Sequence, residues 1–428
     1  MVRMKLQQAG VRIERFLLRI GLTLLLLIGI CLVGKRAIGD WYFRKGSPES
    51  IQAAIRWDGN NPQYCDAWGT LTSFYMISAK FDESVTSFEC ATRLSPYNAH
   101  FWSDLGGAYD RAGRPDDALR AFQRALQLFP LSPEINWRFA NFAFRSHRIP
   151  ETLRALPLVL AGNNPSHRDV FRLALRATPD KDEILEKLPH QALVFFEFLN
   201  FEMEAGDISG AEAAWRRILQ LNLPFDPRLA FPYLDALIQH HESDRLVATW
   251  SALAERFPAE IGALAKPPNL VENGSFEHDL LDGGLDWRVV PVEGAVVSLD
   301  SGDAFERARA LRIEFSGKAN LDYGQVFQYV PVQPNRRYLF SGAIRVKGIT
   351  TDSGPRFQVF DALDMRNLFL STEGSVGSSG WSVQKLEFKT SPATRLLIVR
   401  VARIPSQKLD NLINGTAWID QVRLTAED

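Results

Sequence analysis

The side chains with the clearest potential for chemistry lie on alternate positions of short apolar runs in the last third of the chain. Alternate residues of a strand share one face, so each run presents its polar side chains together. Amide and guanidinium groups hydrogen-bond sugar hydroxyls, and aromatic rings pack on sugar ring faces. The candidates for a glycan site are Tyr323, Gln325, Arg345, Lys347, Arg356, Gln358 and Arg400. If their strands are neighbours, the surface is basic and favours an acidic glycan, although alternation alone does not distinguish a site from a solvated sheet face.

Motifs for catalysis are missing from the sequence. It contains no Gly-rich phosphate loop, no histidine pair with a glutamate at zinc-protease spacing, and no nucleophile elbow. His240 and His241 are adjacent, and neighbours on a helix point about 100° apart, so they do not form a metal pair. We therefore predict no catalytic residue. Two carboxylates brought together by folding would escape this search, so a carbohydrate-active enzyme stays open as the alternative.

The candidate glycan residues need a sheet to position them, and the composition changes where that sheet begins. At Lys266, Pro267 and Pro268 helical periodicity ends, and Gly, Ser and short alternating apolar runs take over. Eight short strands in about 160 residues predict an all-β sandwich or jelly roll. The predicted strands are 295–299, 310–315, 326–332, 338–346, 357–360, 382–388, 396–401 and 417–424.

Both ends of this region resemble the jelly-roll carbohydrate-binding modules, a galactose-binding-like family. The opening likeness lies in Asn269, Leu270, 273–277 and Trp287, and the closing one in 418–424. The resemblance covers residues 269–428 and implies glycan binding, and it implies that Trp287, Trp381 and Trp418 belong to the core. It also implies a structural calcium between the first and last strands, held by Glu277 and Asp420, although Gln421 stands where the family more often has a second acid.

The N-terminal half of the chain repeats with a period of 34 residues. A repeat of this length predicts stacked helix pairs, because one pair cannot bury its apolar face alone. The pattern resembles the tetratricopeptide repeat. We predict a helical array over 47–258, with a third, weaker repeat closing at Pro165, a short irregular stretch at 170–189, and a linker at 259–268. The repeating residues are Trp68, Leu71, Tyr75, Phe88, Ala91 and Pro96, then Trp102, Leu105, Tyr109, Phe122, Ala125 and Pro130.

The tetratricopeptide resemblance implies a concave groove for a protein partner, lined by the first helix of each repeat. Exposed polar positions on any helix give the same pattern, so a plain solvent-facing surface stays open beside the groove. The matching positions are His100, Ser103, Gly107, Asp110, Arg111, Trp137, Asn141, Phe144 and Arg145.

An apolar run near the N-terminus predicts a transmembrane signal anchor at 16–34 behind a cytoplasmic tail at 1–15. Basic residues flank the run on both sides, so the charge bias that favours a cytoplasmic N-terminus is thin. This orientation fits a bacterial inner-membrane protein with most of its chain in the periplasm, where an oxidising environment permits disulfides. We nevertheless expect no bond between Cys65 and Cys90, because their predicted helix positions place their Cα atoms beyond the ~7 Å bridging limit.

Composition narrows the function further. A chain of 428 residues with 46% hydrophobic content supports two or three domains. A net charge of −1 gives no basic surface for nucleic acid, which we exclude. The sequence therefore predicts a multidomain, non-catalytic membrane scaffold that binds a protein and a polysaccharide, in the assembly or export of cell-surface polysaccharide. A glycoside hydrolase and a protein-only adaptor are the alternatives.

Overall fold

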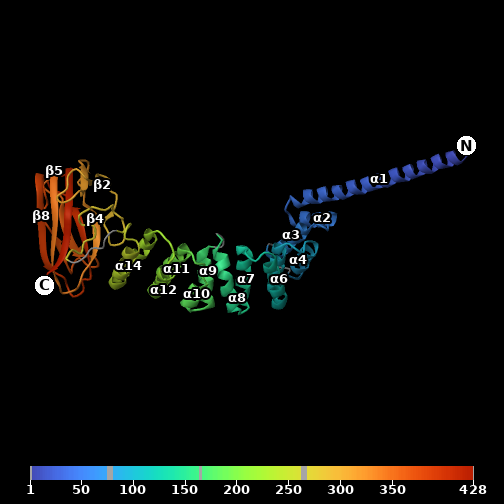
Figure 1. Cartoon of the computed structure of the whole chain (residues 1–428), viewed down its shortest axis with the longest axis horizontal. Helices are drawn as coiled ribbons and strands as arrows, with labels where there is room; N and C mark the ends of the chain where they lie inside the picture. The colour runs from blue at the N-terminus through green and yellow to red at the C-terminus, as the bar shows by residue number, and fades with distance from the viewer. Residues whose placement is uncertain (1, 75–80, 163–165, 262–267, 428) are drawn as a thin grey trace. The chain divides into compact units, whose positions relative to one another are not determined.

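A computed structural model describes residues 2–74, 81–162, 166–261 and 268–427. Tyr75, Pro165, Lys266 and Pro267, which the sequence patterns include, lie outside the described residues. The chain forms two compact units, one of Met1–Phe201 with Ile208–Leu223 and one of Glu202–Asp207 with Pro224–Asp428. Figure 1 shows helices from the N-terminus onward and a β-sandwich at the C-terminal end of the chain. The prediction of a multidomain fold, with a helical repeat array and an all-β sandwich, is confirmed.

The first helix, α1 (Val2–Phe43), is unbroken (Figure 1). Its segment Leu18–Phe43 is long enough and apolar enough to cross a membrane. The last turns of α1 belong to the repeat array, because the Tyr64 hydroxyl donates a hydrogen bond to Asp40. A Cβ atom added at Gly39 would lie 3.2 Å from the Tyr64 ring. The apolar segment therefore runs without a break into the first helical layer, where α1 packs against α2 (Pro48–Trp57).

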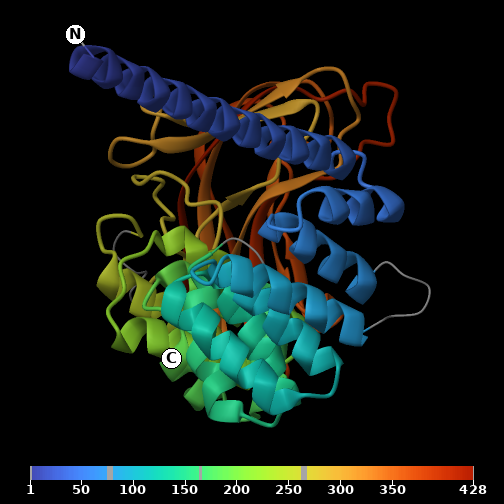
Figure 2. The same cartoon turned by 90° about the vertical axis from the view of Figure 1, so that its right-hand side faces the viewer.

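Three helix pairs follow and carry the 34-residue pattern (Figure 2). Small residues on the first helix of a pair make room for an aromatic ring of the second. A Cβ atom added at Gly69 or at Gly106 would lie 2.9 Å from the ring of Phe88 or of Phe122, so each ring packs directly on glycine backbone. The pairs are α3 (Pro62–Phe74) with α4 (Phe81–Leu94), α5 (Ala99–Arg111) with α6 (Pro115–Leu128), and α7 (Pro133–Arg145) with α8 (Ile149–Leu160).

The helical region continues through α9 (His167–Ala177), α10 (Lys181–Lys187), α11 (Ala192–Glu204) and α12 (Ile208–Gln220). The prediction of an irregular stretch at 170–189 is wrong, because α9 and α10 occupy it. Both helices bury apolar residues, including Phe171 and Ile184, and Asp180 caps α10 by accepting hydrogen bonds from two backbone amides. A seven-residue helix falls short of the repeat length, which hid this pair from the periodicity.

Cys65 and Cys90 are joined by a disulfide, contrary to the expectation from sequence. Their Cα atoms lie 6.0 Å apart. The expectation failed because α3 and α4 run antiparallel, which brings the first turn of α3 beside the last turns of α4. The bond closes a loop of 25 residues and lies within the first full repeat.

We expect the disulfide to protect both cysteines from alkylation in the folded chain. Mass spectrometry after treatment with iodoacetamide should find no label on Cys65 or Cys90, and a label on each of them after reduction in denaturant. Reduction should also destabilise the first repeat by about 2 to 4 kcal/mol, because the unfolded chain regains the entropy of the open loop. Cys31→Ser, which removes the thiol of the apolar segment, serves as the control and should leave this pattern unchanged. Rapid labelling of Cys65 in the unreduced folded protein would contradict the bond.

The second unit begins with the short helix η1 (Pro227–Ala230) and the helix pair α13 (Phe231–Gln239) and α14 (Ser243–Arg256). This pair packs on the sandwich through two glycines. A Cβ atom at Gly283 would lie 2.3 Å from the Phe231 ring, and one at Gly284 would lie 2.2 Å from the Trp250 ring. The predicted division at 259–268 thus falls inside a compact unit that starts at Pro224.

The sandwich consists of two antiparallel sheets, and all eight predicted strands are present. Two further short strands, β1 and β7, form the edges of one sheet. The first sheet has the order β1 (Arg288–Val289), β4 (Tyr323–Pro331), β9 (Leu396–Arg403), β6 (Arg356–Asp361), β7 (Phe369–Ser371). The second has the order β2 (Ala295–Asp300), β3 (Ala310–Ser316), β10 (Asn414–Glu427), β5 (Arg337–Ile349), β8 (Gly377–Lys389).

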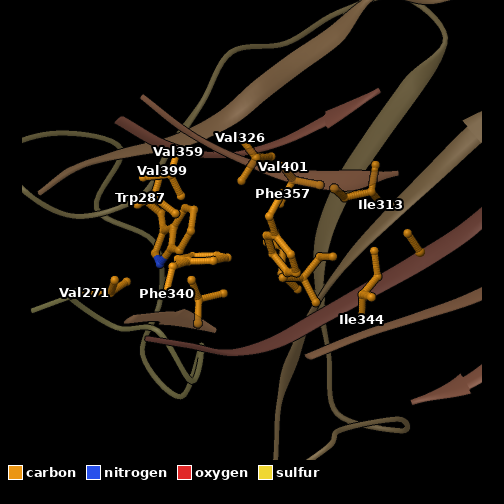
Figure 3. Packing of buried hydrophobic residues seen from close by; sticks show 14 of the residues in the cluster. Val271, Trp287, Ile313, Val326, Phe340, Ile344, Phe357, Val359, Val399 and Val401 are labelled. Atoms are coloured by element: carbon orange, nitrogen blue, oxygen red, sulfur yellow. The ribbon is translucent and has the colours of Figure 1, made fainter. Parts of the chain in front are cut away.

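The core lies between the two sheets, where Trp287 packs among Phe340, Phe357 and the valines of the first sheet (Figure 3). Trp287 is fully buried, as expected. Trp418 is also buried, as expected, although it lies outside the cluster between the sheets, whereas Trp381 is only half-buried and its core assignment is wrong. Ala417 and Ile419 point into the core, so Trp418 between them faces outward, where its Nε1 donates to Asp300 at 2.8 Å. Trp381 contacts the ring of Phe305 in the 300–309 loop, with 5.7 Å between ring centroids.

Candidate functional site

The outer face of the first sheet carries two rows of side chains that cross its strands in register. Val326 and Val330 of β4 point into the core, so Phe327 and Tyr329 between them point outward. Residues opposite each other on neighbouring strands share a face and lie about 5 Å apart. The first row is Arg288, Phe327, Arg400, Gln358 and Ser371. The second row is Tyr329, Ile398, Phe360 and Phe369.

We call these two rows of side chains the outer face. Arginines and aromatic rings contact each other along them. The Nε of Arg400 donates to Gln358 Oε1 at 2.8 Å, and its guanidinium lies 4.9 Å from the Phe360 centroid. The Arg288 guanidinium lies 5.4 Å from the Tyr329 centroid. Burial lowers the pKa of Arg400, because the sheet removes water from the cation. Rings beside oriented guanidinium groups can stack on a sugar ring and hydrogen-bond its oxygens.

Three of the seven predicted glycan residues lie together on this face. Gln358 and Arg400 pair directly in the first row, and Arg356 of β6 lies opposite Ala402 of β9. Gln325 belongs to the same sheet, near the start of β4, and its Oε1 accepts a hydrogen bond from the backbone amide of Gly324.

The other three do not join them. Tyr323 was predicted as an aromatic platform, but it is 2% exposed and packs on Phe315 in the core. Arg345 and Lys347 lie on β5, which belongs to the second sheet, so the predicted single surface is wrong. Arg345 instead pairs with Asp303 and lies over Trp418. Sequence periodicity assigns residues to a face of a strand, but it does not assign strands to a sheet.

Sequence reasoning missed the aromatic members of the outer face. Phe327 and Tyr329 alternate with core positions of β4, and Phe360 alternates with those of β6, so the same period-2 argument applied to aromatic residues would have found them. Arg288 carried no such signal, because β1 is only two residues long.

The two predicted calcium ligands hold the 305–309 loop instead. Asp420 Oδ2 accepts hydrogen bonds from two backbone amides at residues 305–306, at 2.9 and 3.0 Å. Glu277 Oε1 accepts two more from residues 308–309, both at 3.1 Å. Burial raises the pKa of Asp420, with a further contribution from the nearby charge of Glu277, while the backbone hydrogen bonds oppose that shift. The carboxylate oxygens thus face N–H donors.

A cation is also already present at this place. The Arg309 guanidinium donates to the carbonyl of Glu277 and to Asp279, the latter at 2.9 Å. Among the residues that the structure describes, no cluster of three or more Asp, Glu, His or Cys side chains is arranged for a metal. Calcium requires 6 to 8 oxygen ligands, which these residues do not supply. The residues present therefore do not fit the calcium that the family resemblance implies.

We expect the sandwich to be indifferent to calcium. Addition of CaCl₂ or EDTA should leave its melting temperature unchanged, whereas Arg309→Ala should destabilise it by about 2 kcal/mol through the loss of charged hydrogen bonds. Differential scanning calorimetry of the full chain measures both effects. Arg337→Ala, which removes an exposed arginine of β5, is the matched control and should have no effect. A melting temperature that rises with calcium would show that a metal binds.

A groove of about 520 Å³ lies in the first unit, on the face formed by α3, α5 and α7. Six predicted groove residues line it together: Gly107, Asp110, Arg111, Trp137, Asn141 and Arg145. Its wall also contains Thr70, Phe74, Asp104, Phe122 and Arg138, which were not predicted.

Three further predicted groove residues lie elsewhere. Ser103 is fully buried between helices, so its assignment to the groove surface is wrong. His100 is near the start of α5, 4.0 Å from the Glu134 carboxylate, and does not line the groove. Phe144 does not line it either, and its ring lies 5.0 Å from the Arg176 guanidinium.

Ion pairs between successive repeats cross the groove, but Arg111 does not take part in one. Arg138 donates to Asp104 at 2.5 Å, and Arg145 donates to Asp110 at 2.6 Å. Arg111 has no carboxylate hydrogen-bonded to it among the described residues, and residues 75–80 contain no Asp or Glu. Its guanidinium lies 4.3 Å from the Phe74 centroid, and its buried Nε lacks a partner. The groove therefore carries a partly desolvated cation that has Asp104 and Asp110 nearby but no carboxylate hydrogen-bonded to it among the described residues.

Gly107 brings a second guanidinium beside Arg111. A Cβ atom added at Gly107 would lie 3.3 Å from Arg138 Nη2 and 3.4 Å from Arg111 Nη1, so both groups converge over bare backbone. Burial lowers the pKa of Arg111, and the charge of Arg138 adds to this effect. Two converging cations favour an anion between them. Next to this pair, burial and then the charge of Asp104 raise the pKa of Asp66 to about 7, so this carboxyl is about half protonated near neutral pH.

Comparisons with known proteins agree with the repeat assignment. The family described as tetratricopeptide repeat matches residues 78–133. The chloroplastic tetratricopeptide repeat domain-containing protein PYG7 of Arabidopsis thaliana is 32% identical over 79 residues, which are 18% of this chain and 26% of that protein. The chain thus spans about a quarter of this relative. The helical region contains tetratricopeptide repeats.

Solved structures are similar at low identity. A family 16 carbohydrate-binding module aligns with 37% of this chain and 99% of its own, at 18% identity and a TM-score of 0.28. The MamA protein aligns with 46% of this chain and 100% of its own, at 15% identity and a TM-score of 0.32. Alignments at this level carry no functional conclusion.

Proposed function

We propose that this protein is a non-catalytic scaffold anchored to a bacterial inner membrane, with most of its chain on the periplasmic side. Its groove binds an acidic segment of a partner protein, and its sandwich binds a glycan. A protein that holds both at a membrane surface suits the assembly or export of cell-surface polysaccharide.

The outer face of the first sheet is the observation that carries the glycan half of this proposal. Phe327 and Tyr329 offer ring surfaces and Arg400 offers oriented hydrogen-bond donors, while Gln358 and Phe360, only 2% and 7% exposed, contact Arg400 and hold its guanidinium in place. An alternation of rings and guanidinium groups suits sugars, whose apolar ring faces are rimmed by hydroxyls.

The location rests on two features of the first unit. The apolar segment of α1 is exposed to its surroundings along its length, as a membrane span would be. The Cys65–Cys90 disulfide is typical of proteins outside the reducing cytoplasm. Both support an anchored protein whose repeats lie in an oxidising compartment.

We expect outer-face variants to weaken glycan binding. With the full chain in detergent micelles, isothermal titration against acidic and neutral bacterial polysaccharides should show saturable binding, and Tyr329→Ala and Arg400→Ala should each weaken it about tenfold, which corresponds to ~1.4 kcal/mol. Lys347→Ala, an exposed basic residue on the second sheet, is the control and should bind as the unmodified chain does.

The same samples test the alternative functions. Reducing ends should not accumulate, whereas their release would identify a glycoside hydrolase. If no polysaccharide binds, the sugar half of the proposal fails and the protein is an adaptor for proteins alone.

The groove should select for negative charge. Extended peptides rich in glutamate should bind the full chain more tightly than the same peptides with glutamine, and added salt should weaken this binding. Arg111→Ala should reduce the preference about tenfold, as expected for the loss of a charge-assisted hydrogen bond. Arg124→Ala on α6 is the matched control, because it removes an arginine that is hydrogen-bonded to Gln127 and lies outside the groove. Equal binding of both peptide sets, measured by fluorescence anisotropy, would contradict the proposal.

A further inference from the structure

The last helix pair packs closely against the edge of the outer face. Phe231 of α13 and Trp250 of α14 lie on the backbone of Gly283 and Gly284, which directly precede β1. Only glycine fits at either position, because any side chain would collide with a ring. Gly284 also has φ +60°, a conformation that other residues rarely adopt. The helix pair and β1 therefore have a fixed relation inside the second unit.

Asp235 of α13 contacts Arg288, which belongs to the outer face. Its Oδ1 accepts a hydrogen bond from Arg288 Nη2 at 2.5 Å, and the same Nη2 donates to the Gly284 carbonyl at 3.0 Å. The Arg288 side chain is 15% exposed and lies against the Tyr329 ring. Since both anchoring bonds use Nη2, no contact within the described residues occupies Nη1. Asp235 thus fixes the position of an arginine whose other amino group is available.

A second set of hydrogen bonds connects α14 to β4. Trp250 Nε1 donates to the Glu272 carboxylate at 3.1 Å. The backbone of Glu272 exchanges two hydrogen bonds with the Gln328 side chain, at 2.8 and 2.9 Å. Gln328 is fully buried and stands between Phe327 and Tyr329 on β4. Both helices therefore support the strand that carries the outer-face rings.

We infer that α13 and α14 are part of the glycan site, and that Asp235 is a positioning residue that sets a preference for carboxylate-bearing sugars. This inference rests on the proposed glycan function. Arg288 and Arg400 flank Phe327 in the first row, one on each neighbouring strand. A sugar stacked on Phe327 would place an acidic substituent within reach of one or both guanidinium groups. A neutral sugar would gain the ring contact alone.

The charges around Arg400 agree with this assignment. Its Nε donates a hydrogen bond to the neutral amide of Gln358, not to a carboxylate. Asp322 is near enough to raise its pKa slightly, while burial lowers it by more. Arg288 has one hydrogen-bonded carboxylate partner among the described residues, Asp235. The row thus offers two cations, and Arg400 has no carboxylate hydrogen-bonded to it among those residues.

A matched pair of polymers tests the inference with the full chain in micelles. Polygalacturonate and its carboxyl-reduced form share one backbone and differ in the carboxylates. The unmodified chain should bind the acidic polymer at least about tenfold more tightly, and Arg288→Gln should abolish most of that ratio. Asp235→Asn should reduce the ratio several-fold, and Asp235→Glu should restore part of it. Asp244→Asn, at an exposed position of α14, carries the same charge change and should leave the ratio unchanged.

The outcomes separate the inference from the function on which it rests. If the unmodified chain binds neither polymer nor any other polysaccharide, the glycan function fails and this inference with it. If it binds both polymers equally, or if Asp235→Asn and Arg288→Gln keep the full ratio, the glycan function stands and the inference is overturned. A purely structural role for Asp235 would weaken binding to both polymers alike, and this result also overturns it. Unfolding of Asp235→Asn, seen by circular dichroism, leaves the decision to Arg288→Gln and Asp235→Glu.

Discussion

Within each of the two units of this protein, aromatic rings pack directly on glycine backbone and fix how neighbouring elements fit together. Phe88 and Phe122 lie on Gly69 and Gly106 within successive repeats, and Phe231 lies on Gly283 in the second unit. Each contact brings two elements closer than side chains would permit, and the ring fills the space that a Cβ atom would need. The groove of the first unit and the outer face of the second both lie next to such contacts, so their geometry depends on them.

Both candidate sites keep an arginine on an aromatic ring with no carboxylate hydrogen-bonded to it among the described residues. Arg111 lies on Phe74, and Arg400 lies on Phe360. Folding has already removed part of the water around each guanidinium, which is why burial lowers both pKa values. An anionic ligand would then meet a cation that needs little further desolvation or ordering, and preorganisation of this kind improves affinity. A structural role alone would favour a carboxylate partner, as Arg138 and Arg145 have.

Periodicity predicted the elements of this fold but not how they are paired. A period of 34 located the repeats, and a period of two located eight strands, because both follow from which side chains are buried. Neighbours in a sheet depend on chain crossings that no local pattern records, so β5 with Arg345 was placed on the wrong surface. Cys65 and Cys90 show the same limit, since an antiparallel return brings distant helix positions together. Tyr323 lies before the predicted strand 326–332, and β4 is irregular between Tyr323 and Val326, so alternation along the strand did not show that its side chain enters the core.

The packing of α13 beside β1 also solves a problem that any open sheet has. An edge strand exposes unpaired backbone groups to other chains, and proteins cover such edges or keep them very short. β1 is two residues long and has α13 beside it, with Asp235 bound to its first residue. A neutral contact would protect the edge equally well, and burial of an ion pair rarely adds net stability. The choice of an arginine that lies against Tyr329 with one amino group unused is therefore better explained by a ligand on the outer face than by protection of the edge.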